Sequence, residues 1–432
     1  MPGQSDLRQT QRLSPLYAAL LDCFGDAAVR DLLWLLSSPG LLNPGAANIP
    51  QAMHEITPEQ ESRIVDWLYA TEAQPAPLHA WLAASPQKRL GHYAEQLLAF
   101  FLSEGTVGRL IAANLPLRRA NQTLGECDFL LETHDGRRLH WELAVKCYLY
   151  VDEPDPSAPP QVPGTGYDGA ARPGAYASLA CYVGPNLADR FDLKLARMIE
   201  HQLPLSARPE FRALVAGGPW QAELFLCGWL FYPLAPRRQS ACRISALLNP
   251  QHMRGWWASV SDWQRWQPTL GAQAWVVLPR LEWMAQRRFE APAPLEVNSL
   301  GGTPLGGTPL GGTPLGEPLL DSAAMLARLE AHFSPAAGAI AAQAELEPNM
   351  TAPIPPFAGA TASSAVNLRA DSPGAPETKS NPKPAGPWLI AGLKRRGDMW
   401  VECTRGFVVD EDWFARARVY AASRQPGKAS QA

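Results

Sequence analysis

The chain has 432 residues, of which 46% are hydrophobic and 18% charged, so it can build a sizeable core and has a globular composition. Its 38 basic and 41 acidic residues give a formal net charge of −3, which excludes a globally basic nucleic-acid binder; any such contact needs a local basic patch. The seven cysteines occur singly and form no CxxC pair, so neither a zinc ribbon nor a disulfide framework is indicated.

The N-terminal region predicts no targeting or membrane segment. The first dozen residues contain no apolar run, so no secretory signal is expected. The apolar segment from Leu32 to Leu42 is too short to span a bilayer and is interrupted by Ser37, Pro39 and Gly40. We therefore expect a cytoplasmic protein with no membrane partner. The sequence does not determine its oligomeric state.

Residues 14–85 have the pattern of a helical N-terminal lobe. Apolar residues recur at helical spacing in residues 29–36, and further helices are predicted at 58–70 and 77–84. The lobe carries no arrangement of side chains that points to chemistry.

A central domain is predicted over residues 86–285 and begins with an amphipathic helix at 88–104. Glu95 lies at the flank of the apolar face of this helix. Its carboxylate either reaches water at the boundary of that face or points towards a metal or a base in a cleft.

Residues 123–150 predict two strands that are joined by a polar turn at residues 134–136. The turn residues, His-Asp-Gly, favour antiparallel pairing. Because side chains alternate along a strand, Glu142 and Lys146 share one face of the second strand. Asp128 in the first strand is then expected beside Glu142, with Lys146 further along the same face.

A helix is predicted at residues 187–203, after a loop rich in proline and glycine. Four basic residues recur along it at spacings of four, three and four, and so form one row: Arg190, Lys194, Arg197 and His201. Gln202 falls on the apolar face beside this row. The row is either a solvated flank that faces acidic neighbours, or a set of phosphate-binding residues beside a cleft.

The remaining sequence predicts a buried strand at residues 222–232 and a tryptophan-rich region at 256–283. The tryptophans either pack in the core or stack on bases. Residues 286–385 read as a low-complexity, disordered insert, with LGGTP three times in tandem and 15 of the 42 prolines. Within the insert, residues 321–333 favour a short helix. A hairpin at 386–414 is expected to pack back on the core.

The order of these elements resembles the PD-(D/E)XK nuclease-like superfamily: a helix with Glu95, a strand with Asp128, a strand with Glu142 and Lys146, a helix and a further strand. More closely, GHYAEQLLAFFL, TLGECDFLL, HWELAVKCYL, GPNLADRFDLKL and RGFVV are similar to a bacterial family named domain of unknown function eighteen fifty-three. This second resemblance runs from about residue 30 to 413 without the inserts. Together they imply an α/β, restriction-endonuclease-like fold, with a mixed β-sheet core flanked by helices.

The superfamily resemblance also implies a site and a reaction. Asp128 and Glu142 would bind one or two Mg²⁺ or Mn²⁺ ions, Glu95 would contribute, and Lys146 would orient or activate a water that attacks DNA or RNA. Elementary electrostatics is consistent with a cation there. Two carboxylates about 4 Å apart repel by roughly 4 kcal/mol at an effective dielectric near 20, and a hard divalent cation relieves this repulsion.

The sequence departs from the superfamily at the lysine. The usual position, two residues after the acid, is Ala144, whereas Lys146 lies about 13 Å from the acid along a regular strand. A bulge could shorten the gap, Lys146 could serve the substrate, Lys194 could replace it, or the site could be degenerate. Glu126 is either an extra ligand or a partner of a nearby arginine.

Three hypotheses follow. The leading one is a metal-dependent phosphodiesterase that acts on nucleic acid. The second is a nuclease-fold protein that has lost catalysis and acts as a binding or scaffold module, which Ala144 and the net charge favour. The third makes the acidic residues an ordinary salt-bridge network with Lys146 and Arg197 as partners.

Overall fold

The computed structural model describes residues 20–47, 49–53, 57–104, 106–120, 122–151, 176–239, 242, 244–290, 319–334 and 385–423. The tandem LGGTP repeats, most of the predicted insert and the proline-rich loop after residue 151 lie outside these residues.

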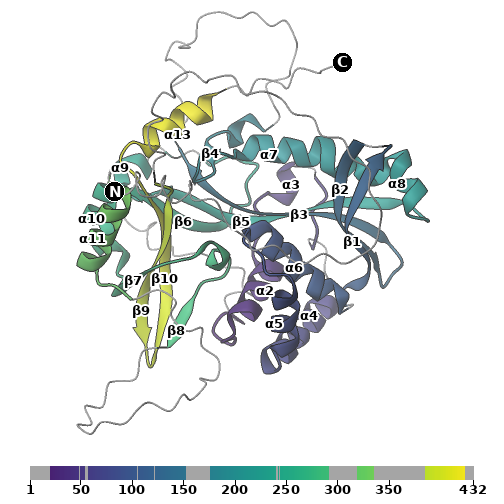
Figure 1. The fold of residues 1–432 in the computed structure, drawn as a ribbon, viewed down its shortest axis with the longest axis horizontal. Helices are drawn as coiled ribbons and strands as arrows, with labels where there is room; N and C mark the ends of the chain where they lie inside the picture. Colours follow the sequence, from purple (N-terminus) through teal and green to yellow (C-terminus); the bar gives the residue numbers. More distant parts are fainter. Residues whose placement is uncertain are drawn as a thin grey trace, which may run out of the picture. The chain divides into compact units, whose positions relative to one another are not determined.

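Within these ranges, ten strands form one mixed sheet in the order β1-β2-β3-β5-β6-β10-β9-β7, with β4 paired to β3 and β8 paired to β10 (Figure 1). Their bounds are β1 Gly108–Arg119, β2 Gln122–Thr133, β3 Arg138–Tyr150, β4 Tyr182–Val183, β5 Trp220–Pro233, β6 Met253–Ser259, β7 Ala274–Val277, β8 Arg288–Glu290, β9 Trp388–Arg396 and β10 Met399–Val409. The first three strands form an antiparallel meander, and β5 runs parallel to β3. The predicted mixed sheet flanked by helices is therefore confirmed.

The predicted hairpin at residues 123–150 is present as β2 and β3. Gly136 in its turn has a φ of 82°, a left-handed conformation that glycine adopts without steric cost. The ladder between the two strands is short, because the last pair towards the start of β2 is Phe129 with Trp141. Asp128 and Glu142 are the next residues on each strand, so both stand where the ladder opens.

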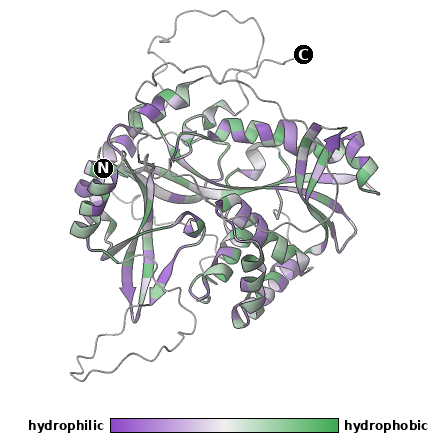
Figure 2. Cartoon of the chain, viewed as in Figure 1, coloured by the Kyte–Doolittle hydropathy of each residue, from purple (hydrophilic) through white to green (hydrophobic). Residues whose placement is uncertain are grey.

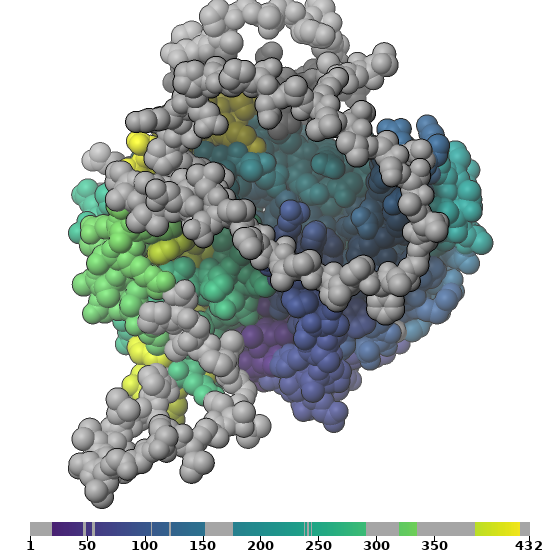
Figure 3. Space-filling view, in the orientation of Figure 1, coloured from purple at the N-terminus to yellow at the C-terminus, as the bar shows by residue number. Residues whose placement is uncertain are grey.

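Helices cover both faces of the sheet. The N-terminal lobe contains α2 Ala27–Ser37, α3 Pro44–Ala47, α4 Pro58–Ala73 and α5 Ala76–Ala84, and α6 Leu90–Ser103 packs beside it. Alternate residues of β3 contact opposite layers: Leu143 and Val145 join the core under this lobe, whereas Ala144 and Tyr148 join a second core. In the space-filling view the N-terminal helices, coloured purple to blue, lie at the surface (Figure 3).

The second core is covered by the connection from β3 to β5. After β4, this connection consists of α7 Phe191–Arg197, a π-helical turn η2 Met198–Gln202, a 3₁₀ turn η3 Leu203–Ala207 and α8 Pro209–Leu214. The single helix predicted at 187–203 is therefore wrong in its start and its continuity. Leu187 has a φ of 53°, which is incompatible with a helix there. Hydrophobic and hydrophilic residues alternate along α7, as its amphipathic pattern requires (Figure 2).

The tryptophan-rich region is packing surface rather than an exposed stacking platform. Trp256, Trp257, Trp263 and Trp275 are all buried. They lie in or beside β6, β7 and α10 Val260–Trp266. The predicted C-terminal hairpin is confirmed as β9 and β10, and it joins the sheet through parallel pairing of β10 with β6.

The remaining α-helices of the described segments are α9 Pro236–Gln239, α11 Ser322–Phe333 and α13 Trp413–Ala422. The short helix predicted within the insert is α11, whereas α13 was not predicted. β8 also falls within the predicted insert, at residues where no strand was expected. The described residues up to 326 and from 386 onward form one compact unit.

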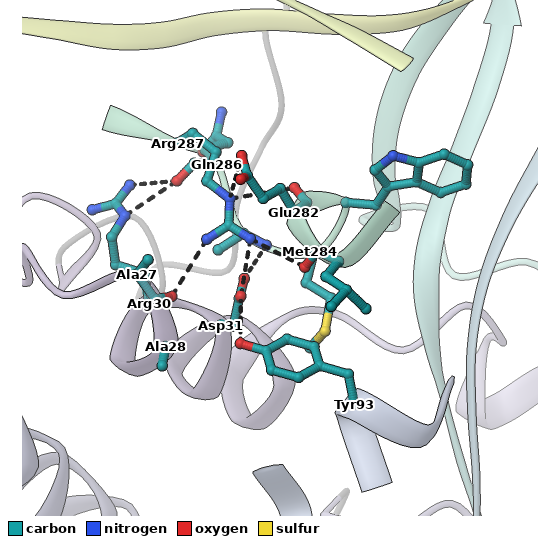
Figure 4. A network of polar contacts seen from close by, with 12 residues as sticks. Ala27, Ala28, Arg30, Asp31, Tyr93, Glu282, Met284, Gln286 and Arg287 are labelled. Atoms are coloured by element: carbon teal, nitrogen blue, oxygen red, sulfur yellow. Dashed lines mark hydrogen bonds and ion pairs between the residues drawn. The ribbon is translucent and has the colours of Figure 1, made fainter. Parts of the chain in front are cut away.

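A buried polar network ties the N-terminal lobe to the segment before β8 (Figure 4). Asp31 of α2 pairs with Arg287 at 2.9 Å, and Tyr93 of α6 donates to the same carboxylate at 3.0 Å. Arg30 donates twice to the carbonyl oxygen of Gln286. These contacts satisfy charges that are almost fully buried, and so they fix α2 against this segment.

Candidate active site at the open end of the β2–β3 ladder

The two carboxylates predicted as metal ligands lie close together at the end of the ladder. The Oδ2 atom of Asp128 accepts a hydrogen bond of 2.9 Å from the backbone N–H of Leu143. The carboxylate of Asp128 thus accepts from a backbone N–H of β3 that lies beyond the last pair of the β2–β3 ladder. Glu142 precedes Leu143 directly, so β3 brings the second carboxylate to the same place.

Glu142 is fully buried, and both of its oxygens have a hydrogen-bond partner. Oε1 lies 2.8 Å from Nε2 of His140, and Oε2 accepts a bond of 2.7 Å from Nε2 of Gln202. Nδ1 of His140 lies 3.0 Å from Oγ of Ser206 in η3. The tautomer of His140 with its proton on Nε2 donates to Glu142, and its Nδ1 accepts from the hydroxyl of Ser206.

The electrostatics of Asp128 show that the carboxylates share one neighbourhood. Burial, and next the charge of Glu142, raise the pKa of Asp128 to about 8, and the charge of Glu95 adds to this rise. The pKa of Glu95 is raised as well, first by burial and then by the charges of Glu126 and Glu142, whereas His92 opposes the rise. The charges of Glu142 and Glu95 thus act on Asp128, and such crowding of negative charge favours protonation or a cation.

Lys194 of α7 is the cation that the structure brings to this neighbourhood. Its Nζ atom donates a bond of 3.1 Å to Oε1 of Gln202. Burial and then the charge of Lys146 lower the pKa of Lys194, and Asp128 and Asp189 oppose that effect. Ala144, at the usual lysine position, is buried in the core that α7 covers.

Lys146 is held elsewhere. Its Nζ atom lies 2.5 Å from Oδ2 of Asp189, which also accepts a bond of 3.3 Å from the hydroxyl of Tyr148. The ladder between β3 and β5 runs without a register shift from Arg138 to Leu149, so no bulge shortens the distance from Glu142 to Lys146. The bulge considered from the sequence is therefore wrong.

The predicted row of basic residues does not act as one surface. Arg190 precedes α7, is buried, and binds Asp192 at 2.7 and 3.0 Å and the carbonyl oxygens of Ala421 and Ser423. Its guanidinium thus ties α7 to the C-terminal helix, and its role in binding substrate stays a prediction. Arg197 and His201 are exposed.

Gln202 turns from the predicted apolar face towards Glu142. It ends the π-helical turn, in which each bond spans one residue more than in an α-helix. This extra residue changes the direction of the following side chains relative to a regular helix, so helical spacing could not place Gln202 from the sequence.

His140 and Ser206 are the site residues that the sequence analysis missed. His140 lies two residues before Glu142, so the alternation of side chains already put both on one face of the strand. Ser206 carried no such signal, because only the folded turn η3 brings it to the imidazole.

The carboxylates fit a divalent cation only in part. The part of the chain that the structure describes contains no group of three His, Cys, Asp or Glu side chains that could hold a metal ion. Mg²⁺ commonly binds to one or two carboxylates and completes its shell with water and phosphate, which suits Asp128 and Glu142. Glu95 contributes charge to the neighbourhood, but no ligand set that includes it is formed among these residues.

Cavities occur elsewhere on the described surface. One of about 510 Å³ lies beside Arg109 and Glu132, and another of about 380 Å³ lies beside Trp141 and Glu223. Neither includes Asp128 or Glu142, so neither adds a ligand cavity to the carboxylate pair.

Comparisons with known proteins identify the family alone. No helix among the described residues has the length and apolar character to cross a bilayer. No curated protein and no solved structure matched the chain. The sequence motifs around Glu95, Asp128 and Glu142 lie within the matched region of a family model that covers residues 30–301, and the chain thus belongs to the family described as Domain of unknown function (DUF1853).

Proposed function

We propose that this protein is a phosphodiesterase that depends on Mg²⁺ or Mn²⁺ and cleaves DNA or RNA. The observation that carries this proposal is the meeting of Asp128 and Glu142 at the open end of the ladder, with Lys194 beside them. The elements α6, β2, β3, α7 and β5 follow one another in the order on which the PD-(D/E)XK resemblance rests, and this order supports the restriction-endonuclease-like fold.

Asp128 and Glu142 would hold the ion, and Glu95 would add negative charge beside them. A bound divalent cation would polarise the phosphodiester and lower the pKa of a water. Because the pKa of Asp128 is raised to about 8, this carboxyl would release its proton on binding a cation. The exposed Arg197 and His201 are available to the phosphate backbone at the edge of the site.

Lys194 is the lysine that we assign to the attacking water. It lies in the electrostatic neighbourhood of Asp128, and burial lowers the pKa of its amine. A neutral amine can accept a proton from water, whereas an ammonium cannot. Lys146, which is bound to Asp189, would serve the backbone of the substrate or the structure.

A second candidate function is supported by the closed state of Glu142. Both of its oxygens are bound within the protein and its side chain is fully buried. A nuclease-fold protein that has lost catalysis and binds nucleic acid or a protein partner would retain such a network for structural reasons. Either function would suit the cytoplasmic location that is expected from the sequence.

Cleavage assays separate the two functions. The purified protein is incubated with single-stranded, duplex and branched DNA and RNA in the presence of Mg²⁺, Mn²⁺ or EDTA. The phosphodiesterase is expected to cleave at least one substrate with metal only, and Asp128→Asn and Glu142→Gln are expected to abolish cleavage. The matched control is Asp135→Asn, an exposed carboxylate in the turn of the same hairpin. Binding without cleavage, unchanged in Asp128→Asn, would support the second function instead.

A further inference from the structure

Two arginines from segments far apart in the chain converge on one aromatic ring. The guanidinium carbon of Arg238 in α9 lies 4.2 Å from the centroid of the Phe414 ring in α13, and that of Arg418 in α13 lies 6.0 Å from the same centroid. The two helices lie side by side in Figure 1. We call Arg238, Phe414 and Arg418 the α9–α13 surface. Arg418 is exposed, and the other two residues are partly exposed.

Stacking on aromatic rings positions the guanidinium of Arg238. The buried Trp257 supports Phe414, with ring centroids 5.6 Å apart and an interplanar angle of 27°. The guanidinium carbon of Arg238 lies over both rings, 5.9 Å from the centroid of Trp257. A guanidinium over an aromatic face keeps its N–H donors at its edge, where they match the oxygen atoms of a phosphate. Because stacking orders the side chain beforehand, less conformational freedom is lost when an anion binds.

Two carboxylates near the start of α13 are bound elsewhere. Asp410 pairs with Arg416 at 2.7 Å, and Glu411 accepts two bonds of 2.8 Å from the second residue of α10. In the part of the chain that the structure describes, neither Arg238 nor Arg418 forms an ion pair with a carboxylate. Their positive charges thus make a local basic patch, which a chain with a formal net charge of −3 needs in order to bind a polyanion.

The last turn of α13 connects this surface to the carboxylate pair. The guanidinium of Arg190, which precedes α7, donates to two carbonyl oxygens at the end of α13. Burial, and next the charge of Asp189, raise the pKa of Tyr420 in that turn. Asp189 binds Lys146, whose charge acts in turn on Lys194. Neighbouring, partly exposed side chains therefore lead from α13 to the site.

We propose that the α9–α13 surface binds the phosphate backbone of nucleic acid beside the position where the strand is cleaved. The inference rests on the proposed function and adds a second contact with the substrate, outside the carboxylate pair. A strand that crosses the carboxylates would run over Lys146 and along α13, so that Arg238 and Arg418 each meet a phosphate. Phosphate contacts do not read bases, so the surface would add affinity without sequence preference. It would also bind nucleic acid in the absence of metal.

The salt dependence of binding tests this surface. Fluorescence anisotropy of a labelled oligothymidylate, titrated with the full-length protein in EDTA at several KCl concentrations, gives the association constant. Its logarithm falls with the logarithm of the salt concentration by about 0.7 for each phosphate contact of a single strand. The double variant Arg238→Gln/Arg418→Gln should therefore reduce this slope by about 1.4. The matched control is Arg63→Gln, an exposed arginine of α4, which lies apart from α13 in Figure 1, and it should leave the slope unchanged.

Two further variants separate a lost contact from a disturbed stack. Arg238→Lys retains the charge and should retain the slope. Arg418→Gln alone changes an exposed side chain and should reduce the slope by about 0.7.

The outcomes for the surface and for the proposed function can be told apart. An unchanged slope in the double variant would overturn the surface and leave the phosphodiesterase possible. The expected reduction of the slope, without cleavage by the wild type in Mg²⁺ or Mn²⁺, would support the surface and overturn the phosphodiesterase. Binding to phosphatidylglycerol vesicles but not to the oligonucleotide would overturn the proposal that this surface binds nucleic acid.

Discussion

The ammonium of Lys146 lies 2.5 Å from the Oδ2 atom of Asp189. This ion pair holds the lysine away from the carboxylates of Asp128 and Glu142. The lysine whose charge acts on Asp128 is Lys194, which reaches the site from α7 rather than from the strand that carries Glu142. The position two residues after Glu142 is a buried alanine that packs under α7. The helix thus supplies the cation that the strand lacks.

This division of roles predicts unequal effects of removing the two lysines. Lys194→Met should lower the rate of metal-dependent cleavage by about 100-fold or more, the range observed when a group that transfers a proton is lost. Lys146→Met should lower it by less than about ten-fold, because its ammonium is bound to Asp189. Single-turnover cleavage rates at saturating Mn²⁺ measure both effects. A larger loss for Lys146→Met than for Lys194→Met would contradict the assignment.

The raised pKa of Asp128 predicts how stability depends on pH. Its native pKa of about 8 lies above the ordinary value of 3.8, so between these pH values the native state holds a proton that the unfolded state has released. The free energy of unfolding should therefore fall as pH rises through this window, by at most about 1.4 kcal/mol per pH unit from this group. The stabilisation is present at low pH and is lost as pH approaches 8.

Asp128→Asn isolates this contribution, because an amide does not ionise. Denaturant unfolding of wild type and variant at pH 5 and pH 8 measures the difference between their slopes. The variant should gain stability relative to the wild type as pH rises. Mn²⁺ affinity of the wild type should rise over the same window, since the cation competes with a proton. Parallel stability profiles of the two proteins would argue against a raised pKa.

The environment of Glu142 predicts a positioning role for His140. Replacing His140 by leucine removes the buried donor to Oε1 of Glu142. Loss of such a partner of a metal ligand typically lowers metal affinity by about 10- to 100-fold, and we expect a loss of this size for Mn²⁺. His140→Gln retains an N–H donor and should recover part of the loss. A purely structural role would instead lower the melting temperature without changing Mn²⁺ affinity in the protein that remains folded. Mn²⁺ titration together with thermal unfolding separates these outcomes.

The sequence was sufficient for the elements with a strong periodic pattern. The antiparallel pairing of β2 with β3, the helix with Glu95 and the buried strand β5 follow from alternation and helical spacing alone. These signals also placed Asp128 beside Glu142, because each residue's face is set by its parity along the strand.

The sequence was insufficient wherever a tertiary contact overrides local spacing. A regular helix over residues 187–203 would align Arg190 with Lys194, but the left-handed backbone at Leu187 delays the helix and Arg190 binds the C-terminal segment. The π-helical turn then directs Gln202 to Glu142. No periodic pattern encodes either departure, because both depend on packing between segments far apart in the chain.

The ion pair between Asp31 and Arg287 predicts a large cost for a single neutralisation. Both side chains are almost fully buried, and Asp31 also accepts hydrogen bonds from Tyr93 and from the backbone N–H of Ala285 (Figure 4). Asp31→Asn removes the nearest counter-charge of the buried Arg287 guanidinium and leaves it only Glu282 at 4.0 Å. Loss of one partner of a buried ion pair costs about 3–5 kcal/mol. Urea unfolding measures the change in the free energy of unfolding.

The matched control for that measurement is Asp22→Asn, which removes a carboxylate that lies 3.6 Å from Arg396 in an exposed pair. Solvent screens this pair, so its loss should cost at most about 1 kcal/mol. Because Asp31 and Arg287 join α2 to the segment that precedes β8, the larger cost should appear for the whole unit, as a shifted midpoint with an unchanged slope. Equal costs for the two variants would mean that burial does not strengthen the Asp31 pair, and that α2 is held to this segment by apolar packing.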